Sequence, residues 1–211
     1  LKEEAQIILD HFKLKVVNEK TIYPIYKNEE ETHWLIISGI GRSNAAASTA
    51  YLYLYSKASI YTSWINLGIA GSDKGNYGDL YLVDKISTYQ GKKSTYPLTM
   101  PKTILPKMHL FTSDIPITDY STHELIDMEG SAFFDIASKL TSKEFICLIK
   151  VVSDGPQNDI KEITKSKISN LIKINLLKII DVISYYEKLS EEEIQIAEKP
   201  KLFCEIKSKW H

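Results

Sequence analysis

The sequence predicts an α/β domain in which helices cover a layered β-sheet. Short apolar runs that end in glycine or in a Ser-Asp pair alternate along the chain with amphipathic or Ala-rich stretches. Apolar runs of this length indicate buried strands, and the stretches between them have helical spacing. Such alternation is typical of layered α/β domains, in which ligands lie at the carboxyl ends of strands.

The first two helices are predicted from residue spacing. Residues 3–12 place Ala5, Ile8, Leu9 and Phe12 on one face. A second helix is expected over 43–58, with Ser43 as its N-cap, because the stretch starts with a run of alanines. Its tyrosines alternate as in a strand, but the length and the alanines favour a helix.

The remaining elements are predicted from prolines, apolar runs and helical spacing. Residues 88–108 contain three prolines and are expected to form a loop, and residues 189–211 form a tail. Strands are expected at 32–41, 59–71, 80–87, 109–117 and 144–154, and helices at 131–140 and 160–188.

Composition favours small-molecule chemistry in one domain, residues 1–211. The net charge is −1 and no lysine patch alternates with aromatics, so we expect no nucleic-acid partner. No apolar stretch reaches the ~20 residues that cross a bilayer, and no signal peptide is visible, so we expect a cytoplasmic protein without a membrane contact. Cys147 and Cys204 have neither disulfide-framework nor zinc-site spacing.

The common catalytic motifs are absent from the sequence. It has no G-x-S-x-G elbow and no P-loop, and its histidines have no metal-ligand spacing, so neither a metal nor a cofactor is expected. "GIGRSN" lacks the third glycine of a dinucleotide fingerprint. Arg42, the single arginine, suits a carboxylate, phosphate or subunit contact, although a solvated surface position explains it equally well. The plausible chemistry is therefore carried by carboxylates.

Polar or glycine-rich segments follow four of the expected strands. We expect them to meet on one rim of the sheet. They are residues 39–42, 68–71, 113–114 and 153–154.

Six short stretches, in this order, resemble the type I nucleoside phosphorylase and nucleosidase superfamily, and within it the methylthioadenosine/S-adenosylhomocysteine nucleosidases. They are "LKEEAQII", "SGIGRSNAAA", "INLGIAG" with "GDLYLVD", "TSDIPI", "DMEGSAFFDIA" and "KVVSDG". The resemblance implies a three-layer domain with a central mixed, partly barrel-like sheet flanked by helices. It also implies a purine nucleoside as ligand, a homo-oligomer, and a first strand that would precede Leu1.

The resemblance also implies roles for individual residues. Asp154 would give a proton to purine N7, which requires burial, because an aspartate of pKa ~3.9 is ionised at neutral pH. Glu129 would accept hydrogen bonds from the ribose hydroxyls while Met128 packs on the sugar, and Glu4 would activate water. Further substrate contacts are expected from the backbone near Ile117 and from Ser153, Gly68, Gly39 and Arg42.

Each acidic residue also has a simpler explanation. Asp154 could be an exposed turn residue, and Glu4 a solvated residue of a first helical turn. Glu129 could simply stand in the first turn of a helix, where the helix dipole favours a negative charge. Gly130 after it would let the backbone approach a ligand.

The acceptor of the sugar is predicted to be water. Phosphorylases of the superfamily usually carry an arginine on the strand that here reads "SWINLGIAG", which has none. Arg42 keeps phosphorolysis open, with inorganic phosphate as a co-substrate, and a catalytically silent nucleoside-binding protein is a third possibility. Ile69 replaces a usual serine and Pro116 a base-stacking aromatic, so deoxyadenosyl or futalosine-like compounds are as credible as methylthioadenosine.

Overall fold

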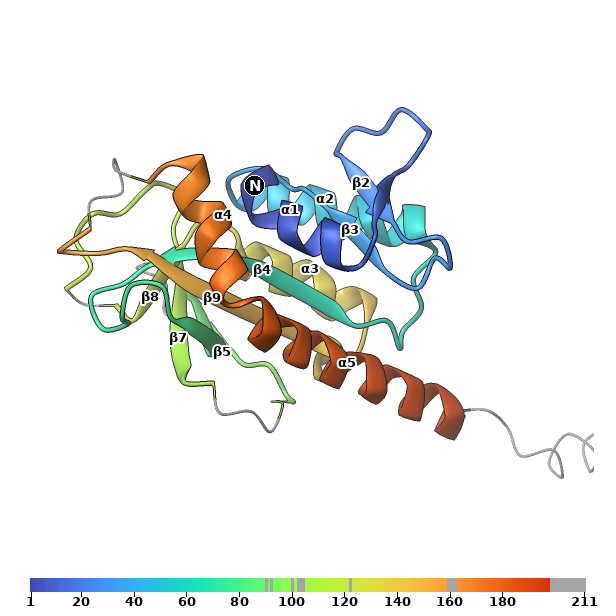
Figure 1. Ribbon diagram of the computed structural model, residues 1–211. Helices are drawn as coiled ribbons and strands as arrows, with labels where there is room; N and C mark the ends of the chain where they lie inside the picture. The colour runs from blue at the N-terminus through green and yellow to red at the C-terminus, as the bar shows by residue number, and fades with distance from the viewer. Residues whose placement is uncertain are drawn as a thin grey trace, which may run out of the picture.

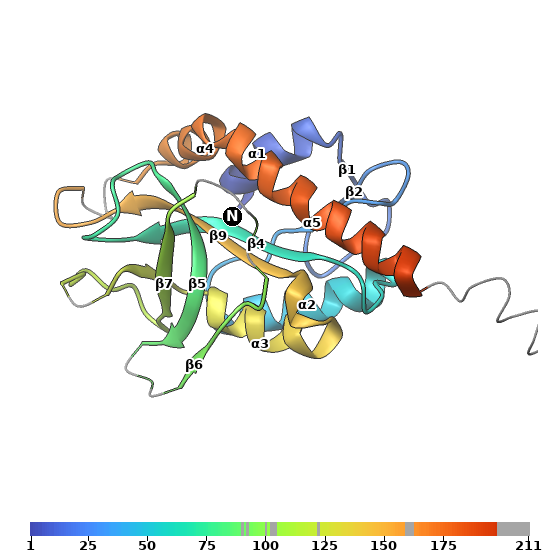
Figure 2. The same cartoon turned by 90° about the horizontal axis from the view of Figure 1, so that it is seen from below.

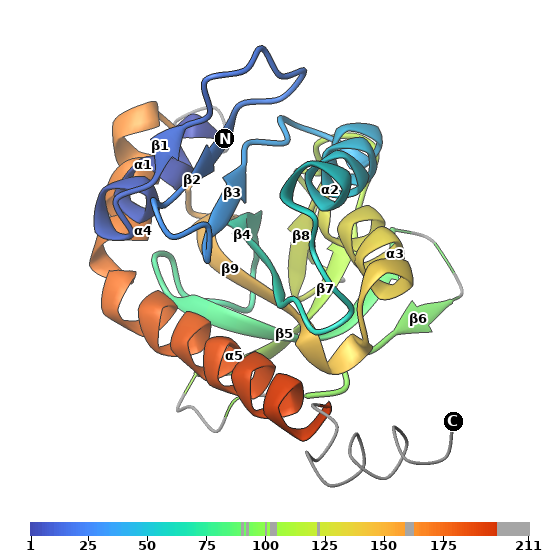
Figure 3. The same ribbon diagram turned by 90° about the vertical axis from the view of Figure 1, so that its right-hand side faces the viewer.

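The centre of the molecule is a mixed β-sheet that closes into a ring. The computed structural model describes residues 1–89, 91, 93–99, 101, 105–121, 123–158 and 163–197. The main strands are β4 Trp64–Gly71, β5 Leu80–Thr88, β6 Ser94–Thr95, β7 Lys107–Thr112, β8 Leu125–Asp127 and β9 Ile146–Asp154. Their order is β6-β5-β7-β8-β4-β9, and an additional pairing of β5 with β9 closes five of them into a ring (Figure 3).

Helices cover the strands from two sides, which confirms the predicted three-layer α/β class. Figure 2 shows α1 (Lys2–His11), α4 (Lys165–Ile174) and α5 (Leu176–Ala197) on one side of the strands, and α2 (Arg42–Ser56) and α3 (Gly130–Leu140) on the other. Two apolar clusters hold the layers together. One joins Ile8, Ile172 and Ile179 to the sheet, and the other includes Leu52 and Phe134.

A second, antiparallel sheet lies near α1 and α2 (Figure 1). Its strands, in order, are β1 Lys15–Val16, β2 Ile25–Lys27 and β3 Trp34–Ile36. The sequence predicted one strand over 32–41, but β3 ends at Ile36. The reason lies in Gly39 and Gly41, whose φ angles of 80° and 98° turn the chain toward α2.

Helix α2 begins earlier than predicted. Its N-cap is Gly41 and its first residue is Arg42, so the expectation that Ser43 caps the helix is wrong. The helix ends at Ser56, and its C-cap, Lys57, has the left-handed conformation. Tyr51 and its two alternating neighbours pack, partly buried, against the core.

The predicted C-terminal helix is two helices, because Asn175 interrupts it. The Asn175 side chain is buried, and its amide donates to the carbonyl oxygens of Gly78 at 2.8 Å and Leu171 at 2.9 Å. Helix α5 then continues to Ala197, into the expected tail, whereas residues 198–211, including Cys204, lie outside the described residues.

Strand β7, predicted over 109–117, ends earlier than expected. Strand β7 stops at Thr112 and not at the predicted Ile117, because its pairing with the short strand β8 ends where Thr112 lies opposite Asp127. Strand β8 was not predicted. The expected 88–108 loop contains strand β6 and the start of β7, and part of it lies outside the described residues. A one-turn 3₁₀ helix, Lys143–Phe145, leads into β9. Within the ranges described, no helix is long and apolar enough to cross a membrane.

Candidate functional site

Strands β4 and β9 run parallel and carry two glycines opposite two charged residues. Gly68 pairs with Lys150, and Gly71 pairs with Asp154 after a register shift that follows Ala70. A Cβ atom on Gly68 would lie 3.2 Å from both Glu4 Oε1 and Lys150 Nζ. A Cβ atom on Gly71 would lie 2.7 Å from Asp154 Oδ2. The glycines therefore leave room for polar groups in the middle of the paired strands and at their C-terminal ends.

Lys150 is a charged residue in the middle of β9, a strand whose residues are all buried. Its side chain is 2% exposed, and its Nζ atom lies 2.8 Å from Asp127 Oδ2. Burial alone would lower the pKa of Lys150, but Asp127, Glu129 and Glu4 outweigh it, so the pKa lies above its ordinary value. Lys150 is therefore protonated and lies among three carboxylates.

The first N–H groups of helix α3 donate hydrogen bonds to side chains of two neighbouring strands. The Gly130 N–H donates to Asp127 Oδ2 at 2.8 Å, and the Ser131 N–H donates to Thr112 Oγ1 at 2.8 Å. Thr112 in turn donates to Asp127 Oδ1 at 2.7 Å. These contacts do the capping, so the side chain of Glu129, the N-cap residue, is free to turn toward α2.

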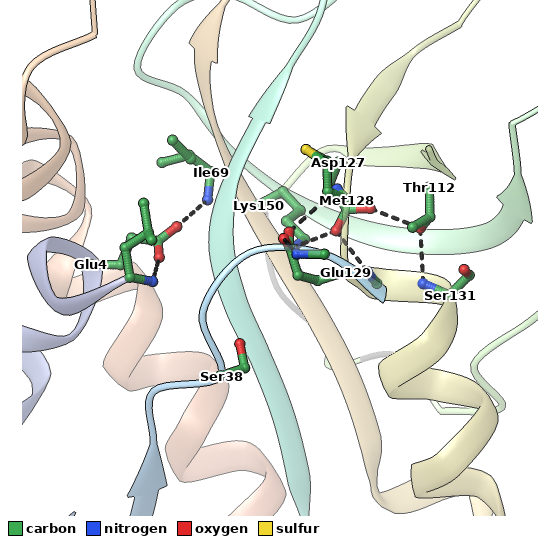
Figure 4. Close-up of polar contacts among 12 residues, drawn as sticks. Glu4, Ser38, Ile69, Thr112, Asp127, Met128, Glu129, Ser131 and Lys150 are labelled. Atoms are coloured by element: carbon green, nitrogen blue, oxygen red, sulfur yellow. Dashed lines mark hydrogen bonds and ion pairs between the residues drawn. The ribbon is translucent and has the colours of Figure 1, made fainter. Parts of the chain in front are cut away.

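Glu129 faces the turn that starts α2. Its Oε1 accepts from the Gly41 N–H at 2.7 Å, and its Oε2 accepts from the Met128 N–H at 3.3 Å (Figure 4). Burial raises the pKa of Glu129, with Asp127 and Glu4 adding to the rise, while Lys150 and the Gly41 N–H oppose it. Glu129 is thus partly desolvated and electrostatically linked to Glu4.

Glu4 reaches the same region from α1. Its side chain is mostly buried, and its Oε1 accepts from the Ile69 N–H at 3.0 Å (Figure 4). Its other oxygen contacts the amino group of Leu1. The fold therefore brings Glu4 and Glu129 to the surroundings of one ammonium group, although 125 positions separate them in the sequence.

Asp154, at the end of β9, is 5% exposed. Its Oδ2 accepts from the Tyr120 hydroxyl at 2.6 Å, and its Oδ1 accepts from the Ser153 hydroxyl. Asp154 is not the exposed turn residue of the simpler explanation, because both oxygens are engaged inside the protein.

Arg42 and Ile117 line a separate part of the rim. A cavity of about 290 Å³ lies between them, close to the ~300 Å³ lower limit of ligand pockets. Its other lining residues come from the ends of β5 and β7: Thr88, Tyr89, Thr112, Ser113, Asp114 and Ile115. Arg42 Nη1 lies 3.2 Å from both Asp114 oxygens, so an aspartate already faces this guanidinium.

Gly39 and Gly130 support the site through backbone shape and packing. Gly39 belongs to the turn that presents the Gly41 N–H to Glu129. Gly130 was expected to let a ligand approach, but a Cβ atom there would lie 2.4 Å from Leu110 Cδ2 and 3.0 Å from Asp127 Oδ2. Its small size serves the packing of α3 on the sheet.

Three polar residues of this region were not predicted: Asp127, Lys150 and Tyr120. Lys150 is the one charged residue of the apolar stretch 145–152, a pattern that indicates a buried ion pair. Asp127 stands just before a helix start, where carboxylates often cap. No pattern in the sequence indicates that Tyr120 points inward.

Comparisons with known proteins place the fold. No protein-family model and no curated protein matches the sequence. Solved structures do match, and the chain has the fold of methylthioadenosine/S-adenosylhomocysteine nucleosidases and of a futalosine hydrolase.

Among these solved structures are two nucleosidases and one related hydrolase. The 5'-methylthioadenosine/S-adenosylhomocysteine nucleosidase of Neisseria meningitidis, in complex with methylthio-immucillin-A, has a TM-score of 0.66 and 17% identity over 87% of this chain and 95% of that chain. The Campylobacter jejuni nucleosidase has a TM-score of 0.66 and 19% identity over 86% and 95%. The futalosine hydrolase of Helicobacter pylori has a TM-score of 0.62 and 14% identity over 92% and 94%.

Proposed function

We propose that this chain cleaves the N-glycosidic bond of a purine nucleoside by hydrolysis. One observation carries the proposal: buried carboxylates from three separate elements lie along two neighbouring strands. Glu4 lies beside Gly68 of β4, Asp154 lies beside Gly71 of β4, and Glu129 acts electrostatically on Lys150, the β9 residue opposite Gly68. A binding protein needs polar contacts there, but it has no need for several carboxylates that burial keeps out of water.

Each carboxylate has a task in this reaction. Bond cleavage passes through a cation-like sugar while negative charge moves into the base, so an acid near the base and a negative group near the sugar both lower the barrier. In the proposed mechanism Asp154 gives a proton to the purine, and Glu129 holds the ribose hydroxyls beside Met128. Glu4 takes a proton from the attacking water.

The charge balance favours water over phosphate as acceptor. Asp127 pairs with Lys150, which leaves the carboxylates of Glu4 and Glu129 beside the sugar position. A phosphate dianion would meet repulsion there, whereas water would not. Arg42, which could otherwise bind phosphate, faces Asp114 at 3.2 Å.

The substrate class follows the structural neighbours. Because the neighbours include methylthioadenosine/S-adenosylhomocysteine nucleosidases and a futalosine hydrolase, we propose a nucleoside with a modified 5' position. We also propose that the protein is cytoplasmic and forms a homo-oligomer.

Release of free base tests the proposal. Purified protein is incubated with methylthioadenosine, adenosine, 5'-deoxyadenosine and futalosine, each with and without phosphate, and the released base is measured by chromatography. We expect release that does not depend on phosphate. Strict dependence on phosphate would replace hydrolysis by phosphorolysis, and binding without release from any nucleoside would indicate a silent binding protein.

A further inference from the structure

Tyr120 is a buried, inward-pointing residue in a loop that is mostly exposed to solvent. Residues 114–121 connect β7 toward β8, and Tyr120 is the buried member of this segment, with 5% of its surface exposed. Asp119 and Ser121 on either side are exposed and bonded to each other. One aromatic side chain therefore anchors the loop in the protein.

The anchor lies on the residue to which we assign acid catalysis. The Tyr120 hydroxyl donates to Asp154 Oδ2 at 2.6 Å, and Ser153 donates to the other oxygen. The tyrosine ring lies directly over Gly71, where a Cβ atom would be 2.4 Å from Tyr120 Cε1. Gly71 thus leaves a flat space, and a phenol ring fills it.

A nucleobase that receives a proton from Asp154 needs that same space. Proton transfer requires the base atom to lie within about 2.6–3.2 Å of the carboxylate. The Tyr120 hydroxyl holds this position at Oδ2, and the ring covers the adjacent glycine. Tyr120 and a purine cannot both occupy it.

We propose that Tyr120 occupies the nucleobase subsite, competes with the base for Asp154, and so determines which bases bind. This inference rests on the proposed function. A base enters only by replacing both the hydrogen bond to Asp154 and the ring contact over Gly71. A flat bicyclic purine replaces both, whereas a smaller ring replaces less contact. Because only the fraction of molecules with Tyr120 displaced can bind, apparent affinity falls by that fraction.

Adenine binding to variants tests this inference. Dissociation constants are measured by calorimetry for the wild type, Tyr120→Ala and Tyr120→Phe, with Tyr77→Ala as the control, because Tyr77 is 46% exposed. We expect Tyr120→Ala to bind adenine at least tenfold more tightly than the wild type. Tyr120→Phe keeps the ring but loses the hydrogen bond, so its affinity should fall between the two. Tyr77→Ala should match the wild type.

The opposite outcomes overturn the inference. Unchanged or weaker binding by Tyr120→Ala would mean that the ring supports the base instead of competing with it. If Tyr120→Ala does not fold, Tyr120→Phe decides, since binding no tighter than wild type would overturn the inference. Absence of adenine binding in every variant would also overturn it.

Nucleoside turnover in the same variants separates this inference from the proposed function. Tighter adenine binding without turnover of any nucleoside would retain the role of Tyr120 and remove the proposed catalysis. Turnover by the wild type without tighter binding in the variants would do the reverse.

Discussion

At the scale of single residues, we expect Glu129 to lower the stability of the fold while it serves the proposed reaction. Its carboxylate is removed from water, so its pKa rises, although Lys150 and the Gly41 N–H favour the charge. A fold that keeps a carboxylate under these conditions loses some stability at neutral pH. A side chain held against this cost is more readily explained by function than by a helix dipole.

Glu129→Gln should lower activity and raise stability at pH 7. Loss of the negative charge that we propose lies beside the sugar should reduce kcat about 10²–10³-fold, as for other electrostatic groups. The folded-state pKa lies above the unfolded one, so ionisation destabilises the fold above both values, and this penalty disappears as the pH falls. The gain in melting temperature should therefore be present at pH 7 and absent below the ordinary glutamate pKa of ~4.3.

Thermal unfolding at several pH values and a steady-state assay check this pair of effects. Glu192→Gln, at an exposed position of α5, is the matched control and should change neither quantity. A Glu129→Gln protein that is less stable at pH 7 would contradict the account.

Cys147 is a buried thiol in β9 and should be inert in the folded protein. Burial raises the pKa of Cys147 to about 12, although a hydrogen bond with Tyr186 opposes the rise. Alkylation requires the thiolate. Iodoacetamide at pH 8 should leave Cys147 unmodified in the native protein and modify it in denaturant, as peptide mass spectrometry can measure. Equal rates in both conditions would show that β9 is accessible.

At the scale of elements, the start of α3 joins helix capping to the site. Asp127 accepts from Gly130 N–H and Thr112, and it also contacts Lys150 at 2.8 Å. One side chain of β8 therefore fixes the helix, the buried lysine and the direction of Glu129. Strand β8 has only three residues, but it lies between β7 and β4, so Asp127 can contact groups of several elements.

Asp127→Ala should be strongly destabilising. It leaves the Lys150 ammonium buried without its closest partner, which typically costs ~3–5 kcal/mol. Asp135→Ala, at an exposed position of α3, is the control and should change stability by less than ~0.5 kcal/mol. Urea unfolding measures both variants. A loss below ~1 kcal/mol for Asp127→Ala would mean that the ion pair does not support the fold.

At the scale of the whole molecule, the sequence predicted what depends on local patterns. The apolar run of β9, the Ala-rich start of α2 and the amphipathic α3 are each specified by neighbouring residues, and the structure has all three. The short strands β1, β2 and β8 have too few residues for a period to be recognised. Pairing of β5 with β9, which closes the ring, joins segments about 70 residues apart and leaves no local signal.

The same division holds for the site. Glu4, Glu129 and Asp154 were identified because they stand in recognisable short motifs, whereas the lysine and the tyrosine that contact them were not. An ion pair between Lys150 and Asp127, or a hydrogen bond from Tyr120 to Asp154, depends on how distant strands and loops meet. The sequence therefore indicated the candidate carboxylates, whereas the residues that contact them could be found only in the structure.

The most direct measurement of the central claim is the turnover number of Asp154→Asn against that of the wild type on the best nucleoside. Asparagine has nearly the same shape and can still accept from Tyr120, but it cannot act as the acid. We predict a kcat reduced by ~100-fold or more with an unchanged melting temperature, because general acid catalysis contributes ~10²–10⁴-fold. An Asp154→Asn protein with wild-type kcat would contradict the account.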